Sequence, residues 1–149
     1  MALRVVQFFA IVLTALSLVP GGAHLFELLN KIDLTAEQYF TVQSIYRGWN
    51  LFAFVLIPAV IVNLVLAAMM RGQALARAMA LLAGACMIAT LVIFFIWVEP
   101  ANRATGYWTT IPADWQSLRQ QWEYGHAVNA VITFVALCSV TVAALVSRK

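Results

Sequence analysis

Four long stretches of this chain contain no Asp, Glu, Lys, Arg or His; they lie at residues 5–23, 51–70, 78–98 and 127–146. They are 19, 20, 21 and 20 residues long. A helix of about that length crosses a hydrocarbon layer roughly 30 Å thick. Because lipid offers an open backbone no hydrogen-bond partners, each stretch must fold as a helix. The short links predict an all-α, four-helix transmembrane bundle with up-down-up-down connectivity, forming one domain over residues 1–149.

The overall composition supports the same class. Hydrophobic residues make up 64% of the chain and charged residues 10%, which is too apolar for a soluble protein of 149 residues. The net charge is +3, but the basic residues form no dense cluster, so we do not expect nucleic acid as a partner. Cys86 and Cys138 lie inside apolar stretches and form no C-x-x-C motif, which argues against a thiol oxidoreductase. The expected surroundings are the lipid bilayer.

The charged residues that flank the apolar stretches predict an orientation. One end carries basic residues only, namely Arg4, Arg71, Arg77, Arg148 and Lys149. All six acidic residues belong to the other end. Because cytoplasmic loops are enriched in Lys and Arg, we expect both termini and the loop 71–77 to be cytoplasmic. The chain is thus predicted to be an integral membrane protein, of the bacterial inner-membrane type.

Helix boundaries can be predicted from capping residues and prolines. Thr35, followed three residues later by Gln38, has the spacing of a capping box. A continuous second helix is expected from there through the second apolar stretch. The third helix is expected to end at Glu99-Pro100, and the fourth to run from about Pro112 almost to the end of the chain. The second and fourth helices should therefore extend beyond the membrane on the outer side.

The two halves of the chain share a faint pattern. Each has a proline near the end of its first helix and an asparagine 30 or 29 residues later, which are Pro20 with Asn50 and Pro100 with Asn129. This pattern indicates a duplicated helical hairpin, 1–72 and 73–149. Sites in repeated membrane folds tend to lie between the repeats.

Polar residues from all four helices are expected to meet in one layer. The first residues past the outer ends of the apolar stretches include His24, Asn50, Glu99 and His126. Further polar residues lie within a turn of that layer: Glu27, Arg47, Asn102 and Glu123. All nine Tyr and Trp residues also belong to the outer half, whereas an anchoring belt would place rings at both interfaces. We therefore predict an outward-facing pocket or cap of polar and aromatic side chains.

Several chemistries are compatible with such a layer. His24, Glu27, Glu123 and His126 are a ligand set that zinc, iron or manganese can use, because each histidine has a carboxylate three residues away. Two histidines on different helices also permit axial ligation of a haem. Alternatively, the carboxylates pair with cations one turn away on the same helices, Glu123 with Arg119 and Glu27 with Lys31.

The layer can also perform catalysis without a cofactor, which is the expectation we favour. His126 or His24 would act as a general base, and Arg47 or Asn50 would stabilise an enolate-like oxygen. Trp122 and the other aromatic rings would hold a flat, apolar small molecule.

Two segments resemble a known family. They are Glu99-Pro100-Ala101-Asn102-Arg103 and Trp122-Glu123-Tyr124-Gly125-His126. Four short transmembrane helices, a P-x-N-R segment at the end of the third and a W-x-x-x-H at the start of the fourth resemble the anthrone-oxygenase-like family of small membrane proteins. The layout fits from about residue 5 to residue 146. Members of that family often carry an Arg three residues after the histidine, where this chain has Asn129.

The resemblance implies a cofactor-independent oxygenase that acts on polycyclic phenolic carbanions. His126 and Asn102 are the positions carried over, with Arg103 and Trp122 beside them in the matching motifs. The competing class is a non-enzymatic subunit, or a homo-oligomer, that docks another protein through an aromatic outer cap. Exposed Trp and Tyr rings would favour docking, and rings turned inward would favour the enzyme.

Overall fold

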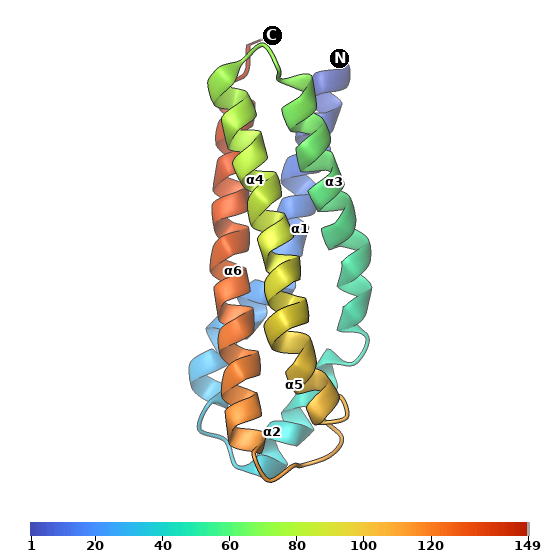
Figure 1. The fold of residues 1–149 in the computed structure, drawn as a ribbon, viewed down its shortest axis with the longest axis vertical. Helices are drawn as coiled ribbons and strands as arrows, with labels where there is room; N and C mark the ends of the chain where they lie inside the picture. Colours follow the sequence, from blue (N-terminus) through green and yellow to red (C-terminus); the bar gives the residue numbers. More distant parts are fainter. Residues whose placement is uncertain (149) are drawn as a thin grey trace.

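A computed structural model describes residues 1–148, and it confirms the predicted fold class. Four helical segments are long and apolar enough to cross a membrane: Ala2–Lys31, Trp49–Met69, Ala74–Ala104 and Trp115–Val146. Their principal helices are α1 (Ala2–Lys31), α3 (Ala53–Met69), α4 (Ala74–Ile93) and α6 (Trp115–Val146). Helix α1 packs against α3 and α6, and α4 packs against the same two helices, so the four close into a bundle (Figure 1).

The two ends of the bundle differ in construction. Both termini and the tight α3–α4 turn lie together at one end (Figure 1). The short helices α2 (Ala36–Gln43) and α5 (Glu99–Ala104), with their connecting loops, lie at the opposite end. This end corresponds to the outer end of the sequence analysis, and we use that name for it below.

Small side chains dominate the half of the core near the termini. Its buried members are Ala10, Ala59, Leu66, Ala67, Met70, Ala76, Ala80, Ala83, Met87, Ala136, Val140 and Ala143. Alanines let helices approach closely in lipid, where packing rather than the hydrophobic effect drives helix association. A separate buried cluster at the outer end is largely aromatic: Tyr39, Val98, Ala101, Trp108 and Trp122. The buried aromatic rings of these two clusters therefore lie at the outer end.

The prediction of a continuous second helix is wrong. Its outer part is the separate helix α2, followed by the short 3₁₀ helices η1 (Ser44–Tyr46) and η2 (Trp49–Phe52) before α3 begins. The break falls at Gly48, whose φ of +89° is a left-handed value that glycine adopts readily and that an α-helix does not permit. The capping box at Thr35 is confirmed, since Gln38 and Thr35 bond reciprocally at the start of α2.

The third helix does not end at Glu99-Pro100 as predicted. A π-helical segment, η3 (Phe94–Val98), follows α4 and leads directly into α5. Pro100 occupies the first turn of α5, where its missing N–H needs no partner, so proline is tolerated there. The helix consequently continues to Ala104 and carries Asn102 further toward the outer end.

Candidate functional site

The two histidines of the chain lie against each other between α1 and α6. The ring centroids of His24 and His126 are 4.2 Å apart, with an angle of 36° between the ring planes. Close approach of the two helices allows this contact. A Cβ atom added to Gly21 would lie 3.2 Å from the Cα of Ala130, so only glycine fits there without a shift. Gly21 precedes His24 by one turn, and Ala130 follows His126 by one turn, so this contact sets the spacing of the imidazoles.

Aromatic rings enclose the histidine pair. The ring of Tyr46 lies 4.4 Å from that of His24, and the ring of Trp49 lies 5.5 Å from it. The ring of Trp122 contacts both histidines, at 4.7 Å from His24 and 4.3 Å from His126, edge-on in each case. His24 is only 3% exposed, whereas His126 is half-buried. The enclosure therefore covers His24 more completely than His126.

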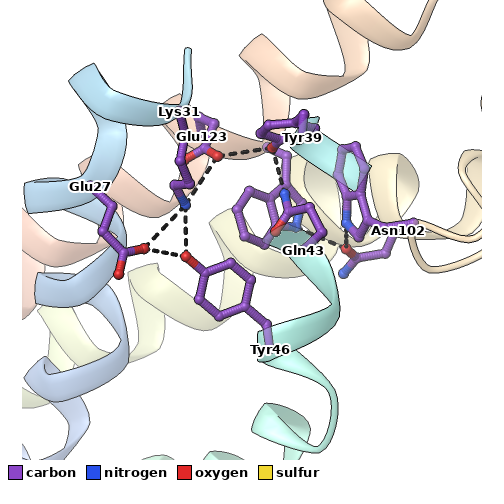
Figure 2. A network of polar contacts seen from close by, with 9 residues as sticks. Glu27, Lys31, Tyr39, Gln43, Tyr46, Asn102 and Glu123 are labelled. Atoms are coloured by element: carbon purple, nitrogen blue, oxygen red, sulfur yellow. Dashed lines mark hydrogen bonds and ion pairs between the residues drawn. The ribbon is translucent and has the colours of Figure 1, made fainter. Parts of the chain in front are cut away.

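A buried lysine connects the two carboxylates beside this enclosure (Figure 2). The Nζ atom of Lys31 lies 3.1 Å from Oε1 of Glu123 and 3.5 Å from Oε2 of Glu27. It also donates to the hydroxyl of Tyr46 at 3.0 Å, and that hydroxyl donates to Glu27. Lys31 is 3% exposed. Its ammonium thus joins α1, η1 and α6 at a single point.

The same network extends to helix α2. The hydroxyl of Tyr39 donates to Oε1 of Glu123 at 2.9 Å, and the Gln43 amide donates to the Tyr39 hydroxyl. Burial, followed by the Glu123 carboxylate, raises the pKa of Tyr39. Burial, followed by the hydrogen bond to Glu27, likewise raises the pKa of Tyr46. Both phenols therefore keep their protons and act as donors to the carboxylates.

Three polar atoms around the site have no hydrogen-bond partner within residues 1–148. They are Nδ1 of His24, Oε2 of Glu123 and Oε1 of Gln43, and each is buried. Leaving such a group unsatisfied costs roughly 1–3 kcal/mol, so its presence in a folded protein calls for a water or ligand partner. The oxygens of Glu123 and Gln43 can each accept a further hydrogen bond, and Nδ1 of His24 can accept or donate one according to its tautomer.

Asn102 holds the tryptophan that contacts both histidines. Its side-chain oxygen accepts the indole N–H of Trp122 at 2.8 Å and that of Trp108 at 3.0 Å. Its amide nitrogen donates to Glu99 at 3.2 Å. A carbonyl oxygen has two lone pairs, so the two indoles use the acceptor capacity of this side chain. Asn102 is consequently a residue that positions Trp122.

Other residues singled out from the sequence lie outside this cluster. The side chains of Arg47 and Asn50 are exposed. Arg103 binds Glu99 at 2.9 Å and is 73% exposed. The structure therefore brings together His24, Glu27, Trp122, Glu123 and His126, with Asn102 adjoining through Trp122.

The two expected ion pairs have different outcomes. The Glu27–Lys31 pair is confirmed. The Arg119–Glu123 pair is wrong, because Lys31 of another helix occupies that side of Glu123. Arg119 instead donates to the backbone oxygen of Leu34 at 2.7 Å, and its guanidinium lies 4.7 Å from the ring centroid of Trp115. Arg119 thus ties the loop before α2 to α6.

The positions of the two histidines and two carboxylates can be compared with what a bound metal ion or a haem would require. Within residues 1–148, no three His, Cys, Asp or Glu side chains are grouped as metal ligands. Glu27 and Glu123 face the Lys31 ammonium instead. Axial haem ligands would stand on opposite sides of a porphyrin plane, whereas the rings of His24 and His126 contact each other. In this arrangement the imidazole pair has no gap for a haem.

Sequence reasoning missed the central role of Lys31, and of Tyr39 and Gln43 beside it. A signal for Lys31 was available. It follows His24 by seven residues and Glu27 by four, which places all three on one face of a helix that leads out of an apolar stretch. Tyr39 and Gln43 also share a face of α2, but the partner of that face could not be known without the fold.

Comparison of the chain with protein-family models gives no match, and comparisons with curated proteins and with solved structures give none either. The apolar helices define the protein as an integral membrane protein with a four-helix bundle fold. Its distinguishing feature is the imidazole pair with an aromatic enclosure and an adjoining lysine–carboxylate network.

Proposed function

We propose that this protein is a membrane-embedded enzyme that oxygenates a flat, apolar small molecule without a cofactor, on the pattern of the anthrone oxygenases. The observation that carries the proposal is the contact between His24 and His126 inside an aromatic enclosure at the outer end of the bundle. The outer end faces away from the cytoplasm in this proposal, with both termini in the cytoplasm of a bacterial inner membrane.

His126 is assigned as the general base. A neutral imidazole accepts a proton at its unprotonated ring nitrogen. His126 is half-buried and contacts the rings of Trp122 and His24, so a flat ring beside it would meet aromatic groups. His24, which is almost fully buried, holds the His126 ring in place. Both histidines lie among apolar helices, where a substrate dissolved in lipid is concentrated.

The chemistry balances with dioxygen as the only co-reactant. His126 removes a proton from a ring CH₂ group that is flanked by aromatic rings and conjugated to a carbonyl. The resulting carbanion gives its electrons to dioxygen, a C–O bond forms, and the imidazolium returns the proton to give a hydroperoxide. Loss of water from the hydroperoxide breaks the O–O bond and leaves a ketone. One dioxygen is consumed, one of its oxygen atoms stays in the product, and the other leaves as water with the two CH₂ hydrogens.

The orientation of the aromatic rings supports an enzyme over a docking subunit. Six of the nine Tyr and Trp residues are buried or half-buried: Tyr39, Tyr46, Trp49, Trp108, Trp115 and Trp122. Three are exposed: Trp97, Tyr107 and Tyr124. Most of the aromatic surface therefore turns toward the interior, where it can line a site for a small molecule.

Oxygen uptake by the reconstituted protein tests the proposal. Purified protein in lipid vesicles is supplied with an anthrone, and dioxygen consumption and ketone formation are followed together, with protein-free vesicles giving the spontaneous rate. The wild type should consume one dioxygen for each ketone formed. His126→Ala should fall to the spontaneous rate, whereas Gln120→Ala, an exposed change on the same helix, should keep the wild-type rate. Equal rates in the wild type and His126→Ala would exclude the assigned base.

A further inference from the structure

Residues 44–52, which we call the strap, cover His24 of the imidazole pair from one side. The strap consists of η1 and η2 joined through Arg47 and Gly48. Its two inward side chains, Tyr46 and Trp49, are those that contact the ring of His24. Its backbone hydrogen bonds outside the helices are local, from Arg47 to Ser44 and from Leu51 to Gly48. The strap is thus a pair of short 3₁₀ helices placed over a buried imidazole.

In this structure the site is closed. The rings of His24 and His126 are already in contact, so no molecule fits between them. His24 is 3% exposed, and its Nδ1 atom is buried without a partner within residues 1–148. A molecule that reaches this nitrogen must first displace one of the rings that surround it.

The covering groups differ in how firmly they are held. Trp122 belongs to the long helix α6, and its indole N–H is bonded to Asn102. Tyr46 is held through its hydroxyl, which binds Lys31 and Glu27. The strap bends at Gly48, where φ is +89° and nothing lies within 4 Å of an added Cβ atom. The strap is therefore held in place by side-chain bonds and a glycine bend, whereas Trp122 is part of a long helix.

We infer that the strap is a lid over His24, with Gly48 as its bend and the Tyr46 hydroxyl as the latch that closes it on Lys31 and Glu27. Opening the latch exposes His24 to molecules from the outer side. The role of the lid in admitting a substrate rests on the function proposed above. Access of a chemical reagent to His24 does not depend on that function, so the lid can be tested by itself.

Histidine acylation measures this opening directly, because the chain contains only two histidines. Full-length protein in lipid nanodiscs is treated with diethyl pyrocarbonate, which acylates neutral imidazoles, and peptide mass spectrometry follows His24 and His126 separately. In the wild type, His24 should react much more slowly than it does in denatured protein. Tyr46→Phe keeps the ring and removes the latch, so acylation of His24 should accelerate roughly ten- to a hundredfold, as expected for loss of a hydrogen bond to charged groups.

Gly48→Ala gives a second test, because alanine is strained at a positive φ and should favour the open strap. Tyr124→Phe and Gly72→Ala are the matched controls. Tyr124 is an exposed tyrosine on α6, and Gly72 lies in the distant α3–α4 turn with nothing within 4 Å of an added Cβ atom. Neither control should change the acylation of His24.

Three outcomes would overturn the lid. One is rapid acylation of His24 in the wild type, at the rate of denatured protein. Another is an unchanged rate in both Tyr46→Phe and Gly48→Ala. The third is an equal acceleration at His24 and His126, since the rings of Tyr46 and Trp49 lie against the ring of His24 and a common rise would report general loosening of the bundle.

Discussion

Replacing Lys31 by methionine should destabilise the protein strongly. Methionine retains the apolar stem of the side chain but removes the ammonium, so the carboxylate of Glu123, which is 0% exposed, loses its ion-pair partner. At 3.1 Å and an effective dielectric constant of about 20, the attraction between the two charges is about 5 kcal/mol. Much of that attraction offsets the cost of burying both charges. The Glu27 carboxylate contributes less, because its side chain is 41% exposed and water screens it.

The expected loss in the free energy of unfolding is therefore about 3–5 kcal/mol, the range for an orphaned buried charge. The double variant Lys31→Met/Glu123→Gln removes both charges and should recover at least half of that loss. Glutamine keeps an acceptor for the Tyr39 hydroxyl. Unfolding in mixed micelles with increasing sodium dodecyl sulfate, followed by the fluorescence of the five tryptophans, measures both variants against the wild type.

The matched control is Arg103→Met, which breaks the ion pair between Glu99 and the exposed Arg103 side chain. It should leave the unfolding curve nearly unchanged, because Arg103 is 73% exposed and the Glu99 carboxylate keeps its hydrogen bonds from Asn102 and Tyr107. The reasoning is refuted if Lys31→Met is as stable as the wild type. It is equally refuted if the double variant is less stable than Lys31→Met alone, since the penalty would then not come from the buried charge.

Two further predictions concern packing around the site. Asn102→Leu leaves two indole N–H groups without an acceptor and should cost roughly 2–5 kcal/mol in the same unfolding assay, with a shift in tryptophan emission, whereas Asn30→Leu at an exposed position should change neither. Gly125→Ala places a Cβ atom 2.7 Å from Cγ2 of Val98 and should cost about 1–3 kcal/mol through overpacking. Gly22→Ala, with nothing within 4 Å of its added Cβ atom, should cost nothing; equal losses at Gly22 and Gly125 would contradict the overpacking argument.

The break in the second helix shows where local sequence signals were insufficient. The capping box at Thr35 uses residues three apart, so it could be predicted and was confirmed. The left-handed conformation at Gly48 could not be predicted from the sequence, because glycine is compatible with both a helix and a turn. Contacts of Tyr46 and Trp49 with His24 favour the turn, and they involve residues more than 20 positions away.

In the candidate site too, some contacts could be predicted from local spacing and others could not. Glu27 and Lys31 are four apart on one helix, and their ion pair followed from that spacing. The partner of Glu123 could not be predicted from spacing, since Lys31 lies 92 positions earlier in the chain. Lys31 takes the place of Arg119, which was the expected partner. The double hydrogen bond from two indoles to Asn102 likewise depends on how α5, α6 and the loop between them meet.

The sequence by itself determined that this is a membrane protein of four helices with its polar and aromatic residues at one end. Apolar stretches of spanning length leave the backbone no alternative to helices in lipid, and that constraint acts within each segment. Only the tertiary structure decided which polar groups face each other. The close approach of α1 and α6 at Gly21 and Ala130 brings two imidazoles into contact and buries Lys31 between two carboxylates, and such contacts depend on distances between helices that no local pattern encodes.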